Sequence, residues 1–275
     1  MITDRLLHEI ISIALAAGDI IMDIYGGPVE VKTKDDSSPV TLADEAAEKH
    51  ILAALKALTP NIPVVAEESV AAGAIPDISD GHFWLVDPLD GTKEFINRTD
   101  EFTVNIALID GGEPLLGVVV APASGLLYYA RTGDGAWKRE GDGAPERLRS
   151  TLADPSGPLR IVESRSHPSP ALEVFLEPFT IAERVKSGSS LKFCVVADGR
   201  ADVYPRLGPT MEWDVAAGDC VYRNSGHPKP HPGTLRYNKP SLKNGSFVIG
   251  LAPGTYELPD DERSQESENR SQKEV

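Results

Sequence analysis

Apolar residues recur every three to four positions between residues 6 and 58 and predict two amphipathic helices. The first is expected from Leu6 to Ile24, where Gly26-Gly27-Pro28 ends it. The second is expected after Thr41, whose hydroxyl oxygen is suited to accept from the free amides at a helix start. Its apolar stripe comprises Ala47, Ile51, Leu55 and Leu58.

Short apolar runs rich in β-branched and aromatic residues follow, each with a turn behind it, and predict strands. These runs cover residues 64–66, 83–86, 102–109, 115–120 and 126–130. Helices followed by several strands are typical of an α+β unit. After residue 157, strand-like runs at 159–162 and 181–185 alternate with helix-like runs at 170–176, 189–197 and 215–222. That alternation predicts an α/β unit.

Composition changes along the chain predict where these units end. Residues 141–157 are rich in glycine, proline, aspartate and serine, which predicts a junction. We therefore expect an amino-terminal half at 1–157 and a carboxy-terminal half at 158–258. Residues 259–275 contain six acidic, three basic and no aromatic residues, which predicts a disordered acidic tail.

The overall composition is that of an ordinary globular enzyme, with 41% apolar and 25% charged residues. No apolar run approaches the ~20 residues that span a bilayer, and no charged leader precedes an apolar segment at the start. We expect a cytoplasmic protein, with peripheral association at the inner membrane left open. The oligomeric state, monomer or homodimer, is also left open.

Charge and cysteine content exclude several classes of partner and site. A net charge of −15 argues against binding to nucleic acid polymers or anionic membranes, although a bound divalent cation can reverse the local sign. Cys194 and Cys220 form no Cys-x-x-Cys pair, which argues against a zinc ribbon or a disulfide framework. We expect both to be buried small apolar residues.

The most informative motif is an acidic turn directly after the strand expected at 83–86. Its sequence is Asp87-Pro88-Leu89-Asp90-Gly91-Thr92. Proline and glycine allow a tight turn that aims both carboxylates at one point, with the Leu89 carbonyl oxygen beside them. Mg²⁺ prefers such oxygen ligands, and a helix starting here would offer the Gly91 and Thr92 amides to a phosphate. The alternative is an acidic turn that only caps a helix.

Two other acidic positions belong to the same prediction. Glu67 and Glu68 end a short strand, and Asp214 opens a helix expected far downstream. Each has an ordinary alternative, since paired acids at a strand end are usually solvated and a lone aspartate at a helix start is usually a cap. Together with the acidic turn they favour a two-metal site, in which ions ~3.5–4 Å apart activate water and clamp a phosphoryl group.

Three stretches resemble the signatures of the inositol monophosphatase superfamily of lithium-sensitive, Mg²⁺-dependent phosphatases, in the same order and at similar spacing up to about Leu258. They are Ala66-Glu67-Glu68-Ser69, Asp87-Pro88-Leu89-Asp90-Gly91-Thr92 and Trp213-Asp214-Val215-Ala216-Ala217-Gly218. The resemblance implies a layered αβαβα sandwich with its metal site between two halves. It implies two or three Mg²⁺ ions held by Glu67, Asp87, Asp90, Asp214 and the Leu89 carbonyl, with Thr92 orienting the attacking water.

The stretch from Lys34 to Thr41 resembles a loop that closes over the metals in this family. By that resemblance Asp36 works with Thr92 to activate water, and Asp44 supports Thr92. The alternative for both aspartates is a polar turn followed by a capped helix. We further predict in-line attack by a water molecule that the metals activate, with Asp36 or Glu67 accepting its proton. No Cys-x5-Arg motif or serine nucleophile elbow suggests a phosphoenzyme.

Three further stretches resemble the bacterial 3′(2′),5′-bisphosphate nucleotidase branch of the superfamily: 201–206, 208–214 and 235–239. Asn244-Gly245 departs from the Asn-Pro common in that branch, and we expect a changed turn without catalytic effect. The branch implies the substrate adenosine 3′,5′-bisphosphate, a by-product of sulfate-donor chemistry, cleaved to AMP and phosphate. Rival interpretations are an inositol or other sugar phosphatase on the same scaffold and a catalytically silent nucleotide or metal sensor.

A nucleotide with a second phosphate requires cationic groups away from the metals. Lys192 and Arg206 match nucleotide contacts of the branch and are expected to bind the 5′-phosphate or line the base pocket. Ser189 is expected to add a hydrogen bond, and Ser164-Arg165-Ser166-His167 is a weaker candidate wall. Gly91, Thr92 and Asp214 complete the expected substrate contacts. The alternative for the cationic residues is an ordinary solvated surface.

Overall fold

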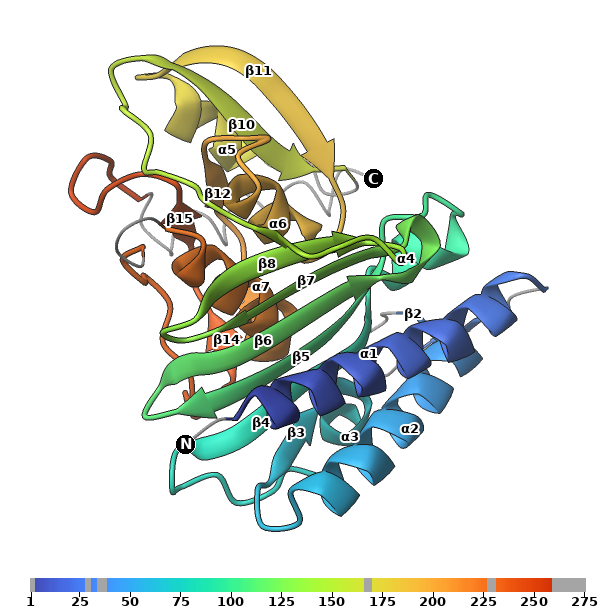
Figure 1. Cartoon of the computed structure of the whole chain (residues 1–275). Coiled ribbons are helices and arrows are strands. Elements are labelled where there is room, and N and C mark those ends of the chain that lie inside the picture. Colours follow the sequence, from blue (N-terminus) through green and yellow to red (C-terminus); the bar gives the residue numbers. More distant parts are fainter. Residues whose placement is uncertain (1–2, 28–30, 34–38, 166–169, 227–230, 259–275) are drawn as a thin grey trace.

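The structure is a computed structural model that describes residues 3–27, 31–33, 39–165, 170–226 and 231–258 (Figure 1). The expectations for Asp36, for most of the loop around it, for His167 and for the tail at 259–275 fall outside these residues.

A seven-stranded sheet forms the centre of the fold, with strand order β3-β4-β5-β6-β7-β8-β9. Only β3 and β4 are parallel; the other neighbours are antiparallel and follow one another along the chain. The strands are β3 (Val64–Ala66), β4 (His82–Asp90), β5 (Thr103–Asp110), β6 (Glu113–Ala121), β7 (Leu126–Arg131), β8 (Gly135–Glu140) and β9 (Glu146–Arg147). The first five confirm the apolar runs expected as strands, whereas β8 and β9 were not expected, because most of their side chains are partly exposed.

Helices α1 (Asp4–Tyr25) and α2 (Leu42–Leu58) cover one face of this sheet, as Figure 1 shows. Thr41 caps α2 as expected, since its hydroxyl accepts from the Ala43 amide. Alternate residues of the strands, such as Trp84 and Val86 on β4, pack against the buried stripes of these helices. Both helices expected from periodicity are therefore confirmed.

Helices α6 (Leu191–Ala197) and α7 (Glu212–Asn224) lie on the opposite face. There Phe83 and Leu85, the other alternate residues of β4, join a core with both helices. Cys194 and Cys220 lie in this core as free buried thiols, as expected. The core combines side chains from both halves expected from the sequence, and the division at residue 157 stays a prediction.

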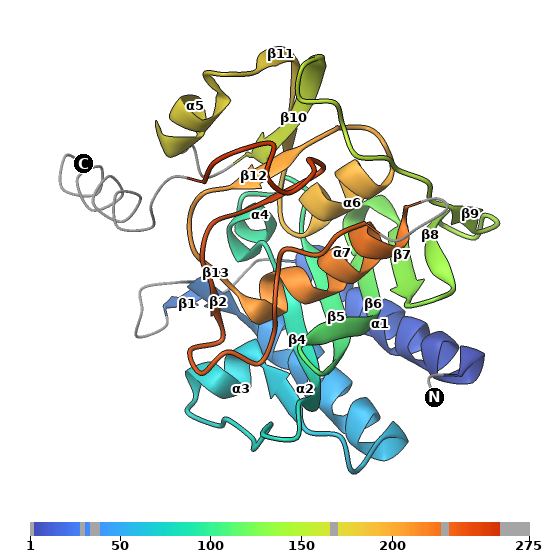
Figure 2. The same ribbon diagram turned by 90° about the vertical axis from the view of Figure 1, so that its left-hand side faces the viewer.

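Further strands and one more helix form the outer layers (Figure 2). Strands β10 (Pro158–Ser164) and β11 (Thr180–Ser187) pair in parallel, and β12 (Tyr204–Arg206) pairs with β15 (Phe247–Ile249). An isolated bridge between Ile161 and Val203 joins the two pairs, and α5 (Pro170–Leu176) packs on them. The order of layers is helix, sheet, helix, sheet, helix, which confirms the expected αβαβα sandwich.

The remaining elements are short and connect these layers. They are β1 (Val31–Thr33), β2 (Pro39–Thr41), α3 (Glu67–Ala71), α4 (Thr92–Ile96), the 3₁₀ turn at Pro122–Ser124, β13 (Thr210–Met211) and β14 (Lys243–Asn244). None of the helices in the described part of the chain combines the length and the apolar character that a bilayer span requires.

Strand β4 contains a β-bulge at the acidic turn. Asp87 pairs with Asn105 and Asp90 pairs with Thr103, so β4 uses one residue more than β5 over this interval. In a regular strand, residues three apart point to opposite faces. The extra residue returns Asp90 to the face of Asp87, the face that also carries α6 and α7. Pro88 lies within this interval and lacks the amide hydrogen that a regular ladder uses.

Gly117 lies where β6 passes closest to α7, the helix that carries Asp214. A Cβ atom there would lie 2.6 Å from both the Ala217 carbonyl oxygen and the Cys220 Cβ atom. We expect Gly117→Val to push α7 from the sheet and to lower the free energy of unfolding by about 3 kcal/mol, as measured by urea denaturation. Gly157→Ala, at a surface turn with ordinary contacts, serves as the control. Equal losses in both variants would contradict this close packing.

Candidate metal and phosphate site

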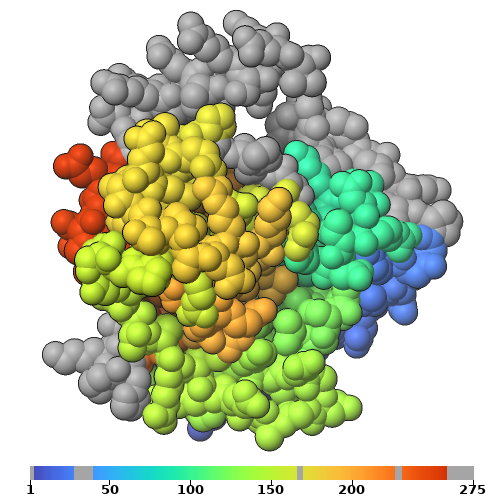
Figure 3. Space-filling view, turned by 90° about the horizontal axis from the view of Figure 1, so that it is seen from above, coloured from blue at the N-terminus to red at the C-terminus, as the bar shows by residue number. Residues whose placement is uncertain are grey.

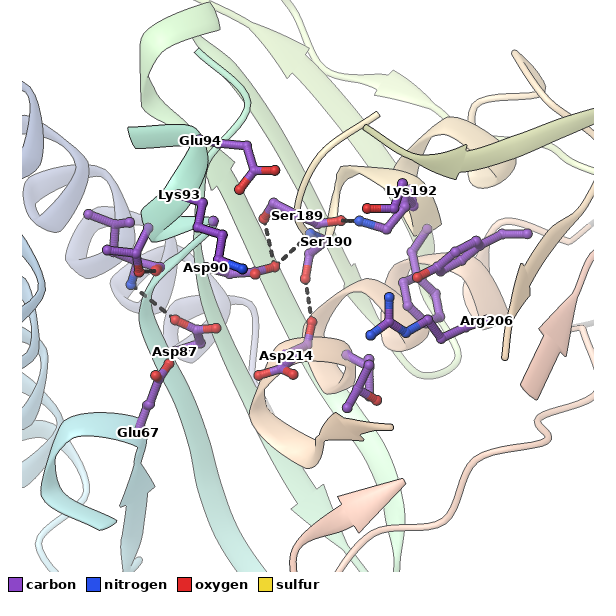
Figure 4. A pocket seen from close by; sticks show the side chains of 18 residues that line it. Glu67, Asp87, Asp90, Lys93, Glu94, Ser189, Ser190, Lys192, Arg206 and Asp214 are labelled. Atoms are coloured by element: carbon purple, nitrogen blue, oxygen red, sulfur yellow. Dashed lines mark hydrogen bonds between the residues drawn. The ribbon is translucent and has the colours of Figure 1, made fainter. Parts of the chain in front are cut away.

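A pocket opens between the end of β4 and the amino ends of α6 and α7 (Figure 4). Ten of the site residues expected from the sequence line it. These residues are Glu67, Asp87, Leu89, Asp90, Gly91, Thr92, Ser189, Lys192, Arg206 and Asp214. They come from six separate elements and their flanking turns, so the fold brings together residues that are up to 147 positions apart in the sequence. Their individual roles stay predictions.

Glu67, Asp87 and Asp214 converge on one point, with carboxylate oxygens within 4.8 Å of one another. Figure 4 shows the three side chains facing a common space. Burial, and after it the charges of Glu67, Asp90 and Asp214, raise the pKa of Asp87 well above its ordinary value. Burial and the charge of Asp90 likewise raise the pKa of Asp214. A divalent cation at this point relieves the repulsion.

Local hydrogen bonds fix the positions of Glu67 and Asp214. Glu67 is the first residue of α3, and the buried carboxylate of Glu48 on α2 accepts from the amides of Glu68 and Ser69, which fixes that helix start. Asp214 is the third residue of α7, because the helix begins at Glu212, before the run expected at 215–222. Its carboxylate accepts from the Met211 amide at 2.8 Å and thereby stabilises the helix start.

Asp90 lines the same pocket with a different set of partners. Its Oδ2 atom accepts from the Ser189 hydroxyl at 2.6 Å and from the Ser190 amide at 2.7 Å. These bonds tie the end of β4 to the start of α6. Both fall on one oxygen, which leaves Oδ1 as the oxygen of Asp90 better placed to bind a cation.

Thr92 is held by Asp44, as the resemblance implied. The Thr92 hydroxyl donates to Asp44 Oδ1 at 3.2 Å, with the Leu89 carbonyl oxygen at 3.4 Å as a second acceptor. Asp44 Oδ2 accepts from the Thr41 amide and hydroxyl, so one buried carboxylate both caps α2 and holds Thr92. Gly91 precedes Thr92 at φ 94°, a left-handed conformation that favours glycine, and α4 starts immediately after it.

The opposite wall of the pocket carries positive charge. Lys192 is buried, and its Nζ atom donates to the Ser189 carbonyl oxygen. Burial, reinforced by the charge of Arg206 and opposed by that of Asp90, lowers the pKa of Lys192 to about 8. Arg206 donates to the carbonyl oxygens of Gly208 and Pro209, which holds its guanidinium at the pocket wall (Figure 4).

Glu101 and Arg165 do not line the pocket but form an ion pair next to Ser164 and Gly188. Arg165 donates to both carboxylate oxygens of Glu101, and Glu101 also accepts from the Gly188 amide. In Figure 3 the segment around residue 100 accordingly lies beside the segment that holds β10 and β11. Ser164 lines the pocket, so part of the weaker candidate wall is in place, whereas Arg165 is occupied by this ion pair.

Sequence reasoning missed several residues that line the pocket or lie buried outside its lining. They are Glu48, Thr103, Asn105, Ser190, Tyr204 and Glu212. The sequence position of Glu48 could have indicated a buried acid, because Glu48 directly follows Ala47, a residue of the apolar stripe of α2. Thr103 and Asn105 carried none, since polar residues within a predicted strand do not reveal which side chain they will meet.

The fold and the acidic pocket together define a class of metal-dependent phosphate-ester hydrolases. Residues 3–256 match the model of the inositol monophosphatase family, and the chain belongs to this family. It is 48% identical over 251 residues to the 3′(2′),5′-bisphosphate nucleotidase CysQ of Salmonella typhimurium, covering 90% of this chain and 100% of the relative. The CysQ of Escherichia coli K12 is 47% identical over 223 residues, covering 80% and 88%.

Solved structures agree with this assignment. CysQ from Bacteroides thetaiotaomicron, described as a bacterial member of the inositol monophosphatase family, superposes with a TM-score of 0.71 at 39% identity, covering 89% of this chain and 96% of that chain. The IMPase of Thermotoga maritima superposes with the same TM-score at 24% identity and 99% coverage of both chains, which is a likeness of fold alone.

Proposed function

We propose that this protein is a 3′(2′),5′-bisphosphate nucleotidase that hydrolyses adenosine 3′,5′-bisphosphate to AMP and phosphate. The observation that carries the proposal is the pocket itself, where Glu67, Asp87 and Asp214 converge opposite Lys192 and Arg206. Such a pocket suits an ester with a phosphate at each end, one beside the acids and one beside the cations. Identity of 47–48% to two proteins named CysQ supports the same substrate.

The donor set fits magnesium. The converging atoms are carboxylate oxygens, the ligands that Mg²⁺ takes in proteins, and burial makes their mutual repulsion costly without a cation. We assign Glu67, Asp87, Asp90, Asp214 and the Leu89 carbonyl oxygen to two or three Mg²⁺ ions. Bound there, the ions supply positive charge that lowers the pKa of water and offsets the charge of the phosphoryl group.

The residues of the chain then orient the nucleophile. Because the Thr92 hydroxyl hydrogen is directed to Asp44, the lone pairs of its oxygen are available to accept a hydrogen from a water molecule. Glu67, or Asp36 by its sequence position, accepts the proton that the water loses. The amides of Gly91 and Thr92 are assigned to the phosphate oxygens. No side chain in this scheme forms a covalent intermediate.

A cytoplasmic location, a monomer or homodimer, and two halves joined near residue 157 remain parts of the proposal. Peripheral association at the inner membrane is not retained, because no described feature supports it.

The test compares two substrates under the same conditions. Phosphate release is measured with Mg²⁺ and either adenosine 3′,5′-bisphosphate or inositol 1-phosphate. We expect the larger kcat/KM for the nucleotide, because Lys192 and Arg206 give a second phosphate its counter-charges. A clearly larger kcat/KM for inositol 1-phosphate would transfer the proposal to an inositol phosphatase. Absence of release from both would favour a sensor.

Lys192 provides a test of how the second phosphate is bound. We expect Lys192→Met to raise KM about 30-fold with a smaller change in kcat, since a hydrogen bond between charged groups contributes about 2 kcal/mol. Lys138→Met, which removes a lysine paired with Asp198 outside the pocket, should leave KM unchanged. Equal KM values in both variants would show that Lys192 does not contact the substrate.

The low pKa of Lys192 gives the same contact a pH signature. Lys192 is protonated below a pH of about 8 and loses its charge above it. We therefore expect kcat/KM, which reports the free enzyme, to fall as the pH rises above about 8. Lys192→Arg keeps its charge at these pH values and should shift this fall to higher pH. An unchanged profile in Lys192→Arg would assign the fall to another group.

A further inference from the structure

Asn105 on β5 is a buried polar residue for which the proposed mechanism has no use. It is 1% exposed, and its side-chain Nδ2 atom has no hydrogen-bond partner among the described residues. A buried amide N–H without an acceptor costs about 1–3 kcal/mol, so its place in the fold calls for an explanation. The β4–β5 register places Asn105 opposite Asp87 and Thr103 opposite Asp90, on the same face of the sheet.

A continuous line of polar contacts leads from Asn105 to Asp90. Thr103 Oγ1 lies 3.1 Å from the Asn105 side chain and 2.5 Å from Ser189 Oγ, and Ser189 Oγ lies 2.6 Å from Asp90 Oδ2. Thr103 is fully buried and Ser189 is 9% exposed, so the line is largely shielded from water. Ser189 adopts φ 52°, a conformation that non-glycine residues rarely take, which indicates that the loop is held in place for its contacts.

Counting hydrogens shows how these groups must be oriented. The line has three contacts: Asn105 to Thr103, Thr103 to Ser189, and Ser189 to Asp90. An ionised carboxylate has no hydrogen to donate, and neither does the Asn105 oxygen. When this oxygen faces Thr103, the two hydroxyl groups therefore supply only two hydrogens for the three contacts. A half-turn of the Asn105 amide exchanges its nitrogen and oxygen without moving other atoms. It supplies the third hydrogen and gives Nδ2 an acceptor. If the hydrogen bonds ran in the opposite direction, Asp90 would have to be protonated in order to donate to Ser189. A cation bound to Asp90 disfavours this protonated form.

We propose that Asn105 and Thr103 are positioning residues for Asp90: the Asn105 amide donates to the Thr103 hydroxyl, which donates to Ser189, whose hydroxyl donates to Asp90 Oδ2. This line of hydrogen bonds fixes the orientation of the Asp90 carboxylate and leaves Oδ1 as the oxygen that would bind a cation. This inference rests on the proposed function only in that it takes Asp90 to be a magnesium ligand. Groups that orient a metal ligand in this way typically change metal affinity by about 10- to 100-fold.

The test measures Mg²⁺ binding by isothermal titration calorimetry without nucleotide. Thr103→Val and Asn105→Leu preserve shape and remove one link each, and both should weaken Mg²⁺ binding about tenfold. Thr103→Ser restores the hydroxyl and should bind within about threefold of the wild type. Thr59→Val, which removes the hydroxyl that accepts from the Trp84 indole on the α2 side of the sheet, should lower stability and leave Mg²⁺ affinity unchanged.

The double variant Thr103→Val/Asn105→Leu separates a chain from two independent packing effects. If the residues act in series, the double variant loses about tenfold, like each single one; independent effects would multiply to about a hundredfold. Multiplied effects, or wild-type affinity in both single variants, overturn the proposal. The binding measurement contains no nucleotide. A protein that binds Mg²⁺ normally but hydrolyses no nucleotide bisphosphate would therefore refute the proposed function without contradicting the roles of Asn105 and Thr103.

Discussion

Asp90→Asn is expected to remove nearly all phosphatase activity, about a thousandfold, while the protein remains folded. An asparagine oxygen can still accept from Ser189 and Ser190, so the tie between β4 and α6 survives. The negative charge that attracts the cation does not. The measurement is kcat at saturating substrate and Mg²⁺, with circular dichroism to establish the fold.

Asp134→Asn is the matched control for Asp90→Asn. Asp134 lies in the turn between β7 and β8, pairs with Arg131 and does not line the pocket. This control should retain wild-type activity. Activity of Asp90→Asn above a tenth of the wild-type value would refute the assignment of Asp90 as a metal ligand.

Asp87→Asn is expected to abolish activity and yet to stabilise the metal-free protein. Asp87 is 1% exposed and faces the charges of Glu67, Asp90 and Asp214, so its own charge is unfavourable without a cation. A neutral amide keeps an oxygen that can accept from the Leu89 amide, as the carboxylate does now. We expect the free energy of unfolding in EDTA to rise by about 1–3 kcal/mol.

Magnesium should reverse this order of stability. A ligand that binds only the native state stabilises it by about 2.7 kcal/mol at a hundred times its dissociation constant. The wild type should therefore gain stability when Mg²⁺ replaces EDTA, and Asp87→Asn should gain much less. Urea denaturation in both conditions measures the four values. A metal-free variant less stable than the metal-free wild type would contradict the repulsion inferred at this site.

Much of the site could be predicted from the sequence because its residues lie in short motifs. Asp87, Asp90 and Asp214 each follow or open a recognisable element, and their joint presence indicated a metal site before any geometry was known. The helices α1 and α2 could be predicted because their apolar periodicity is strong. Strand β8 could not, since it lies near the sheet edge and only Ala136 among its side chains is buried.

Other features depend on pairing partners that a sequence does not specify. The bulge that returns Asp90 to the face of Asp87 exists only in the register between β4 and β5. Helix α7 starts at Glu212, three residues before the run expected at 215–222, because Asp214 stabilises the helix start from inside the first turn by accepting from the Met211 amide. The role of Asn105 and Thr103 depends on their contact with Ser189, which lies in a loop more than eighty residues later in the sequence.

Ser189 contacts both the acidic and the cationic side of the pocket, and this has a thermodynamic consequence. Its hydroxyl donates to Asp90, and its carbonyl oxygen accepts from Lys192. A nucleotide that draws Lys192 away from that carbonyl disturbs the same residue that steadies Asp90. Occupancy of one side is then felt by the other, and linkage requires the influence to be mutual: by whatever factor the nucleotide alters the affinity for magnesium, magnesium alters the affinity for the nucleotide.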